Sequence, residues 1–100
     1  MYIVITTTNN IDNARKLSKV LLKKRLAACI QQSKIKSYYI WQNKNIKDKE
    51  ILLILKTKKN KLKDIKKIFK KYHNYKVPEF ISIKIDNVSS SYLKWLKDTI

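Results

Sequence analysis

The chain has 100 residues and a strongly basic composition, with 24 Lys and Arg against 7 Asp and Glu and a formal net charge of +17. We expect one domain spanning residues 1–100, whose 44% hydrophobic content is enough for a core that folds without a metal or cofactor. No apolar run approaches the roughly 20 residues that cross a bilayer, and the first residues lack a signal-peptide pattern. The single cysteine, Cys29, excludes an intramolecular disulfide. We therefore expect a cytoplasmic protein with no membrane partner.

The first elements alternate between strand and helix patterns. The β-branched run 2–7 predicts a short buried strand. Asn9, Asn10 and Asp12 are typical of a helix start, and the apolar residues after them recur every three or four positions with Lys and Arg between them. This pattern predicts an amphipathic helix that ends near Lys24.

The middle of the chain predicts a β-hairpin. Residues 27–41 are rich in Ile, Tyr, Ser and Gln and favour a long, bent strand, and the apolar run 51–55 favours a central strand covered on both faces. The polar stretch 42–48 between them is the expected tip of the hairpin. In this tip Asn43 and Asn45 tolerate the left-handed backbone that glycine would otherwise adopt.

The last part of the chain predicts a second amphipathic helix, a bend, a strand and a short helix. Asn60 is the expected N-cap, and one apolar stripe follows it, formed by Leu62, Ile65, Ile68, Phe69 and Tyr72. Residues 73–79 contain the only proline, which makes the segment a rigid bend. Alternating isoleucines over 81–85 predict a half-buried strand, and the serines at 89–91 can cap a final helix.

The order of these elements is β-α-β-β-α-β followed by a helix. It predicts an α+β fold of the ferredoxin-like type, with both main helices on one face of an antiparallel sheet. The other face needs a cover, and the run Tyr38, Tyr39, Ile40 and Trp41 is too apolar to be left to water. We therefore expect a homo-oligomer formed through the sheet, with Tyr39, Trp41 and Trp95 in interface and core packing.

The positive charge has two interpretations. A basic chain is typical of a protein that binds nucleic acid or an anionic surface. However, Lys outnumbers Arg by 22 to 2, glycine is absent, and the lysines are dispersed along the chain. A bias of this kind indicates a solvated lysine surface, and nucleic acid is not an expected partner.

The bend 73–79 concentrates chemistry that the rest of the chain lacks. It holds the only histidine, His73, and one of the two glutamates, Glu79. With Cys29 these residues are the candidate metal ligands. Copper and zinc sites take three or four such ligands, so one chain offers no convincing site, whereas a homo-oligomer presents several copies of each.

Each candidate ligand also has a structural alternative. Cys29 can be a small buried apolar residue. His73 can be a hydrogen-bonded group at a helix end, where the partial negative charge favours its protonated form. Glu79 can accept a hydrogen bond or salt bridge from Lys56, from Arg25 or from a neighbouring chain.

Five motifs follow one another along essentially the whole chain. They are Arg25 to Ile30, Ser37 to Trp41, Glu50 to Thr57, His73 to Glu79, and Tyr92 to Leu96. In this order and spacing they resemble the signatures of the CutA divalent-cation tolerance proteins. The resemblance implies a ferredoxin-like fold in a tight homotrimer, in which strands of neighbouring subunits extend each other's sheets. It also implies a link to copper and other divalent cations and, in animals, to a membrane-anchored esterase.

The chain departs from the family pattern in the bend and in the hairpin. Asn74 follows the histidine where the family usually has proline, and Lys76 stands where an acidic or small polar residue is common. The loop 42–49 lacks the usual glycine. These departures bear on cation affinity at that surface and leave the expected fold unchanged.

The resemblance therefore implies a trimeric, non-catalytic protein of divalent-metal tolerance that binds copper. The chain shows no Ser/His/Asp order and no glycine-rich phosphate loop, so no enzyme class is indicated. Lys56, Tyr75 and Glu79 are expected to line a cleft between subunits. The alternatives are a trimeric sensor that binds a small ligand in this cleft and a basic ferredoxin-like module that binds nucleic acid.

Overall fold

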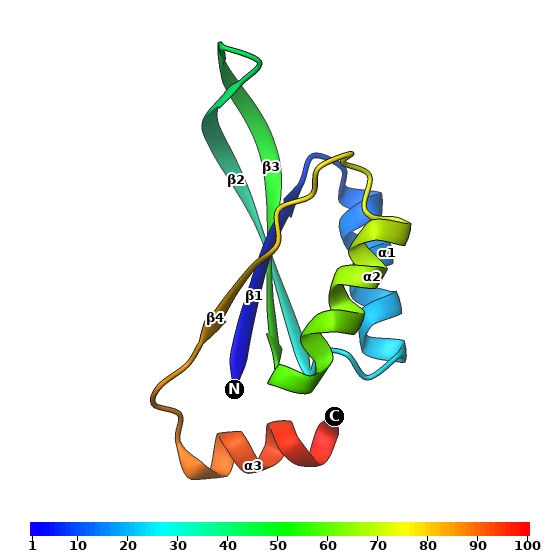
Figure 1. Ribbon diagram of the computed structural model, residues 1–100, viewed down its shortest axis with the longest axis vertical. Coiled ribbons are helices and arrows are strands. Elements are labelled where there is room, and N and C mark those ends of the chain that lie inside the picture. Colours follow the sequence, from blue (N-terminus) through cyan, green and yellow to red (C-terminus); the bar gives the residue numbers. More distant parts are fainter.

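The computed structural model describes residues 1–100 and contains four strands and three helices (Figure 1). In chain order they are β1 (Tyr2–Thr8), α1 (Ile11–Lys23), β2 (Cys29–Trp41), β3 (Lys44–Thr57), a 3₁₀ turn (Lys59–Lys61), α2 (Leu62–Tyr72), β4 (Ile81–Lys84) and α3 (Ser90–Thr99). The strands form one antiparallel sheet in the order β2-β3-β1-β4. The predicted α+β fold with an added C-terminal helix is confirmed.

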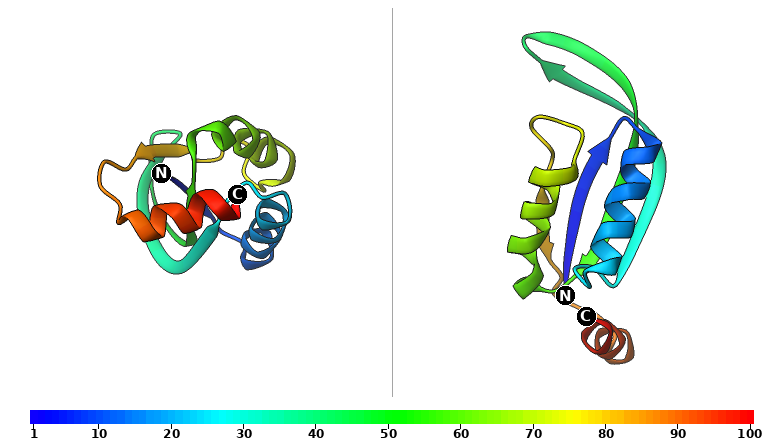
Figure 2. Two further views of the ribbon diagram at one scale, coloured as in Figure 1. Left: turned by 90° about the horizontal axis from the view of Figure 1, so that it is seen from below. Right: turned by 90° about the vertical axis from the view of Figure 1, so that its right-hand side faces the viewer.

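Both main helices cover the same face of the sheet, where they lie side by side (Figure 2). The buried side chains of the two layers interdigitate in one cluster, which includes Val4, Leu53 and Leu55 of the sheet and Leu17, Leu21, Ile65 and Phe69 of the helices. The side chain of Asn10 caps α1 by accepting a hydrogen bond from the Asn13 backbone N–H at 3.0 Å. Helix α3 lies across the end of the sheet near the N-terminus (Figures 1 and 2) and buries Leu96. None of the three helices is long and apolar enough to span a bilayer.

The hairpin tip is much shorter than the sequence indicates. The strands stay paired up to Trp41 and Lys44, so only Gln42 and Asn43 form the turn, with φ of 50° and 63°. Two successive left-handed residues match the twist of a two-residue hairpin. The predicted tip over 42–48 is therefore wrong, because Asn45 belongs to β3 and pairs with Ile40.

Two further details differ from the sequence-based expectation. Asn60 is not the N-cap of α2, because the chain enters this helix through the 3₁₀ turn Lys59–Lys61, which contains Asn60. The run 51–55 is not covered on both faces either. Its odd-numbered residues are buried under the helices, whereas Leu52 and Ile54 are half-buried on the opposite, open face.

The open face of the sheet is apolar and uncovered in one chain. Ile3 and Ile5 of β1 pair with Ile83 and Ile81 of β4, so all four side chains share this face. Ile81 and Ile83 are 46% and 44% exposed. A soluble chain seldom leaves such a surface bare.

The aromatic run at the end of β2 does not lie on a single face. Successive strand residues point to opposite sides, so Tyr38 and Ile40 face one way and Tyr39 and Trp41 face the other. The hairpin carries them beyond the rest of the sheet (Figure 1). The expectation that all four residues lie on the open face is therefore wrong, although each of them is exposed.

The side chains buried between the sheet and the two main helices allow a test of the core assignment. Replacing the fully buried Leu53 with Ala should lower the free energy of unfolding by about 2–5 kcal/mol, because it removes apolar contacts and leaves a cavity. The matched control, Leu22→Ala on the outer side of α1, should change it by no more than about 0.5 kcal/mol, since Leu22 is 45% exposed. Urea denaturation followed by circular dichroism measures both values. Equal effects would contradict the assignment of the core.

Candidate functional site

The segment between α2 and β4 is held against β1 by the ring of His73. The ring Nε2–H donates to the backbone carbonyl of Thr7 at 3.0 Å and lies 3.2 Å from the hydroxyl of Thr6, and Nδ1 accepts from the backbone N–H of Tyr75 at 3.0 Å. One nitrogen therefore donates and the other accepts, as in a neutral imidazole. Burial lowers the pKa of His73, and the hydrogen bond to Thr7 opposes this shift only in part.

These hydrogen bonds bear on the structural alternative for His73, a hydrogen-bonded group at the end of α2. The ring is arranged for its neutral form and not for the protonated form expected at the end of α2, because burial lowers the pKa of His73 and its Nδ1 atom accepts a hydrogen bond. The structural role is present, since both ring nitrogens have partners within the chain. To bind a metal, the ring would have to give up one of these hydrogen bonds.

Hydrogen bonds of Asn74 connect the same bend to α1 and to the residues just before α1. Its side-chain carbonyl accepts from the hydroxyl of Thr8 at 2.7 Å, and its amide donates to the side chain of Asn9 at 2.9 Å. Its backbone N–H donates to the side chain of Asn13 at 3.2 Å, and Asn13 in turn donates to the carbonyl of Tyr72 at 2.8 Å. A proline at position 74 could make none of these side-chain contacts, so the departure from the family pattern has a structural function here.

The two glutamates of the chain meet beside this bend. Glu50 is 7% exposed and accepts a hydrogen bond of 2.6 Å from the hydroxyl of Tyr75. Glu79 lies nearby, and its Oε2 is buried without any hydrogen-bond partner. Burial, and then the negative charge of Glu50, raise the pKa of Glu79. Burial, and then the hydrogen bond to Glu50, raise the pKa of Tyr75 well above its ordinary value.

These groups line a groove of about 590 Å³ between the hairpin and the bend, which we call the glutamate groove. The rings of Tyr39, Trp41 and Tyr75 form part of its wall, and both glutamates contribute to it. The hydroxyl of Tyr39 also donates to Asp48 at 3.4 Å. Aromatic rings and carboxylates therefore face one space.

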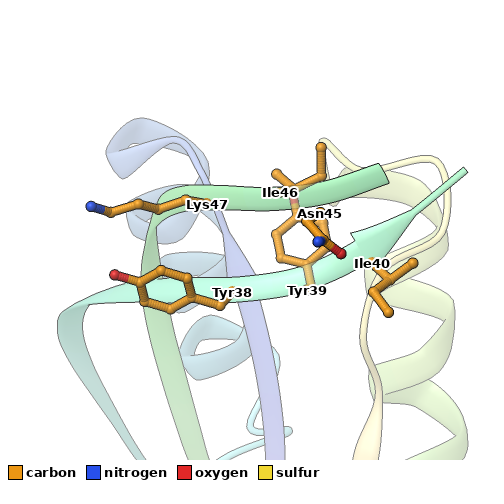
Figure 3. Close-up of a pocket in the computed structure, with 6 residues that line it drawn as sticks. All are labelled: Tyr38, Tyr39, Ile40, Asn45, Ile46 and Lys47. Atoms are coloured by element: carbon orange, nitrogen blue, oxygen red, sulfur yellow. The ribbon is translucent and has the colours of Figure 1, made fainter. Parts of the chain in front are cut away.

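A second hollow of about 390 Å³ lies farther out on the hairpin. Figure 3 shows Tyr38 beside Lys47, whose Nζ is 5.7 Å from the centre of the ring, and Tyr39 next to Ile46. The hollow contains no acidic group and is largely apolar. It is therefore better suited to packing against another protein surface than to binding a cation.

The other predicted site residues lie at the opposite end of the sheet. Cys29 pairs with Lys56 at the start of β2, six positions along β3 from Glu50, which corresponds to roughly 20 Å. Cys29 is half-buried, not fully buried as its structural alternative supposes. Within one chain Cys29 is not brought together with His73 and Glu79, and no group of three or more His, Cys, Asp and Glu side chains is placed to hold a metal ion.

Lys56, which pairs with Cys29, also lies far from Tyr75 and Glu79, the other two residues of the expected cleft. Its Nζ lies 5.4 Å from the centre of the Tyr92 ring, on α3. Arg25 donates to the carbonyl of Thr99 at 3.4 Å, so neither cation reaches Glu79 in the same chain. The residue that does accompany Tyr75 and Glu79 is Glu50. The sequence analysis did not predict that Glu50 belongs to this site. The pattern that could have indicated it is a single acidic residue directly before the apolar run 51–55.

Comparison with known proteins identifies the family. The sequence profile of the family described as CutA1 divalent ion tolerance protein matches residues 2–99. The chain belongs to this family.

Several relatives support the assignment over the full length. The chain is 42% identical over 96 residues to the divalent-cation tolerance protein CutA of Pyrococcus horikoshii, which covers 96% of the chain and 94% of the relative. It is 34% identical to the protein of the same name from Thermotoga maritima, over 100% of the chain and 99% of the relative. The crystal structure of CutA1 from Pyrococcus horikoshii matches with a TM-score of 0.94 at 39% identity, covering 99% of the chain and 97% of that structure. The predicted family resemblance is confirmed.

The carboxyl of Glu79, which has no hydrogen-bond partner at Oε2 within the chain, predicts an unusual dependence of the free energy of unfolding on pH. Its folded pKa is raised, so the charged form costs stability above that pKa, and this cost disappears as the pH falls through it. Replacing Glu79 with Gln should therefore raise the free energy of unfolding at pH 8, by less than about 1 kcal/mol because solvent screens this partly exposed group, since it removes a charge that burial and Glu50 disfavour. At a pH near 4, where the unfolded carboxyl itself becomes protonated, the gain should vanish.

The measurement is urea denaturation at both pH values and at a fixed protein concentration. The control is Asp86→Asn, which removes the same charge from an exposed position. A stability of Glu79→Gln that is lower than wild type at pH 8 would contradict the prediction.

Proposed function

We propose that this protein works in the cytoplasm as a non-catalytic homotrimer that supports divalent-cation tolerance by binding ions, copper among them. The observation that carries the proposal is the match of the CutA1 family over residues 2–99, together with relatives named for divalent-cation tolerance. The family name describes tolerance to ions and implies no reaction.

The uncovered surfaces of the chain support a trimer. Strand β4 pairs only with β1 and leaves its outer edge free, next to the exposed Ile81 and Ile83. The projecting hairpin exposes Ile40 by 74% and Trp41 by 52%. Free strand edges and large apolar patches are the surfaces that subunits use to associate. In our proposal Tyr39, Trp41 and Trp95 belong to these contacts.

The trimer is also required for the proposed cleft and for the proposed metal site. The expected cleft of Lys56, Tyr75 and Glu79 can form only if the partner subunit's Lys56 faces the bend, because the two ends of the sheet are far apart in one chain. The same holds for an ion shared by Cys29, His73 and Glu79. Thiolate and imidazole suit copper, so these ligands from different subunits remain our candidates.

The nucleic-acid alternative receives no support from the sheet. The open-face residues of the central strands include Ile3, Ile5, Leu52 and Ile54, which are aliphatic. Sheet surfaces that recognise single-stranded RNA stack bases on aromatic rings at such positions. We therefore favour an open face that packs against protein.

A substitution in the hairpin tests the assembly. Trp41→Asp should convert the trimer to monomers or make the chain insoluble, because it places a charge in an apolar contact. The control Leu22→Asp introduces the same charge on the outer side of α1 and should leave the assembly intact. Sedimentation velocity gives the mass of each species. A Trp41→Asp variant that still sediments as a trimer would show that the interface lies elsewhere.

Metal stoichiometry tests the function itself. Copper and zinc should bind in a fixed ratio to the trimer, and Cys29→Ser and His73→Asn should each reduce the number of ions bound or weaken their affinity about tenfold or more. Equilibrium dialysis with elemental analysis measures both quantities. Asp64→Asn is the control, since its carboxylate is exposed and paired only with Lys67, at 3.9 Å. A protein that binds neither metal at micromolar concentration would refute the proposed ion binding.

A further inference from the structure

The fold gathers basic side chains on the two main helices, although the lysines are dispersed along the sequence. Helices α1 and α2 lie side by side on one face of the sheet (Figure 2). They carry nine of the 24 cations of the chain, all exposed, namely Arg15, Lys16, Lys19, Lys23, Lys63, Lys66, Lys67, Lys70 and Lys71. We call this surface the lysine face.

Only two carboxylates accompany these cations. Asp12 lies 3.6 Å from Arg15, and Asp64 lies 3.9 Å from Lys67, each pair within one turn of a single helix. The other five acidic residues of the chain lie outside both helices. The remaining seven lysines of the lysine face therefore have no carboxylate within ion-pair distance.

Helix α2 repels itself along this face. Three pairs of its lysines stand four residues apart and so lie next to each other on the helix surface. The pairs are Lys63 and Lys67, Lys66 and Lys70, and Lys67 and Lys71. Like charges at this spacing destabilise a helix, and the single ion pair of this helix, at Lys67, opposes only part of the repulsion. A bound anion would remove it.

The lysine face is continuous from one helix to the other. The Nζ atoms of Lys16 in α1 and Lys71 in α2 lie 5.1 and 5.2 Å from the centre of the same ring, that of Tyr72. The chain advances by roughly 10 Å along α2 from Lys63 to Lys70, and the axes of packed helices are about 8–10 Å apart. The face can therefore contact several anionic groups of one ligand at once.

The exposed side chains restrict the kind of anion. All six exposed residues of α2 are charged, so this helix offers no ring on which a nucleic-acid base could stack and no apolar side chain that could enter a bilayer. Both helices lie flat on the sheet, so neither projects as a helix that enters the groove of duplex DNA does (Figure 2). Lysine binds phosphate as a point charge, which favours a flexible chain of bare phosphate groups.

The lysine face also lies outside the subunit contacts proposed above. Those contacts use the open face of the sheet, the free edge of β4 and the hairpin, whereas α1 and α2 cover the opposite face of the sheet (Figure 2). Assembly through these contacts leaves the lysine face of each subunit open to solvent.

We propose that the lysine face binds linear inorganic polyphosphate, a flexible anion without bases or lipid. Its oxygens accept hydrogen bonds from lysines of both helices, and its charge removes the repulsion along α2. Binding releases counterions from the polyphosphate, so the affinity falls steeply with salt concentration. The site uses none of Cys29, His73 and Glu79 and is separate from the ion binding proposed above.

The test is a calorimetric titration of the full-length protein with linear polyphosphate of defined chain length at several concentrations of potassium chloride. Orthophosphate, a short random-sequence duplex DNA and phosphatidylserine vesicles, each at equal phosphate concentration, are the comparison ligands. Polyphosphate should bind saturably at physiological salt, and about tenfold or more tightly than each comparison ligand.

A triple variant of α2 tests the position of the site. Lys63→Gln/Lys67→Gln/Lys70→Gln should weaken polyphosphate binding about tenfold or more, because three phosphate contacts are lost. It should also lower the slope of log affinity against log salt concentration by about 2 to 3. Arginines at the same three positions keep the charge and should bind within about threefold of wild type.

The charge-matched control is Lys44→Gln/Lys94→Gln/Lys97→Gln. It removes the same three charges from the hairpin and from α3, outside the lysine face. Its affinity should stay within about threefold of wild type, with an unchanged salt slope. Circular dichroism and sedimentation velocity on every variant establish that fold and assembly are intact, as expected for substitutions of exposed lysines.

Other results would overturn the proposal. They are the absence of saturable polyphosphate binding at physiological salt, an equal loss in the charge-matched control, and tighter binding of duplex DNA or of vesicles than of polyphosphate. Copper stoichiometry of the α2 variant should equal that of wild type. Failure of the polyphosphate site and failure of the proposed ion binding are therefore observed separately.

Discussion

The hydrogen bonds of the neutral His73 ring are the constraint on which the site depends. One ring nitrogen is fixed to β1 through Thr7 and the other to the backbone of Tyr75, so the ring joins the end of α2 to the sheet. This joint directs Tyr75 toward Glu50 and leads the chain through Pro78 into β4. Asn74 strengthens it with contacts to Thr8, Asn9 and Asn13. The only histidine of the chain thus acts first as a structural clamp.

The electrostatics of the molecule act on two scales. The net charge of +17 is spread over solvent-facing lysines and repels cations at long range. At short range two carboxylates and three aromatic residues line the glutamate groove. A site of this kind selects its ligand by contact, because the field of the whole chain attracts anions. The ion binding proposed above therefore depends on local ligands.

Much of the fold could be predicted because it follows from local patterns. The apolar stripe of α2 and the alternating strands are properties of neighbouring residues, and so is the proline bend at Pro78. The errors lie where tertiary contacts override local signals. The asparagines at 43 and 45 look alike in sequence, yet strand pairing leaves only Asn43 in the turn. Asn60 has the chemistry of a cap, but the chain reaches α2 through a 3₁₀ turn.

The sequence by itself determined the family, the order of the elements and the identity of the reactive residues, since these depend on composition, spacing and periodicity. Only the tertiary structure decided which of those residues meet. Register placed Cys29 and Lys56 at one end of the sheet and Glu50 at the other, and the clamp at His73 brought Glu79 to Glu50. The physical reason is that strand pairing and burial join residues that are distant in the chain, and no local pattern records such contacts.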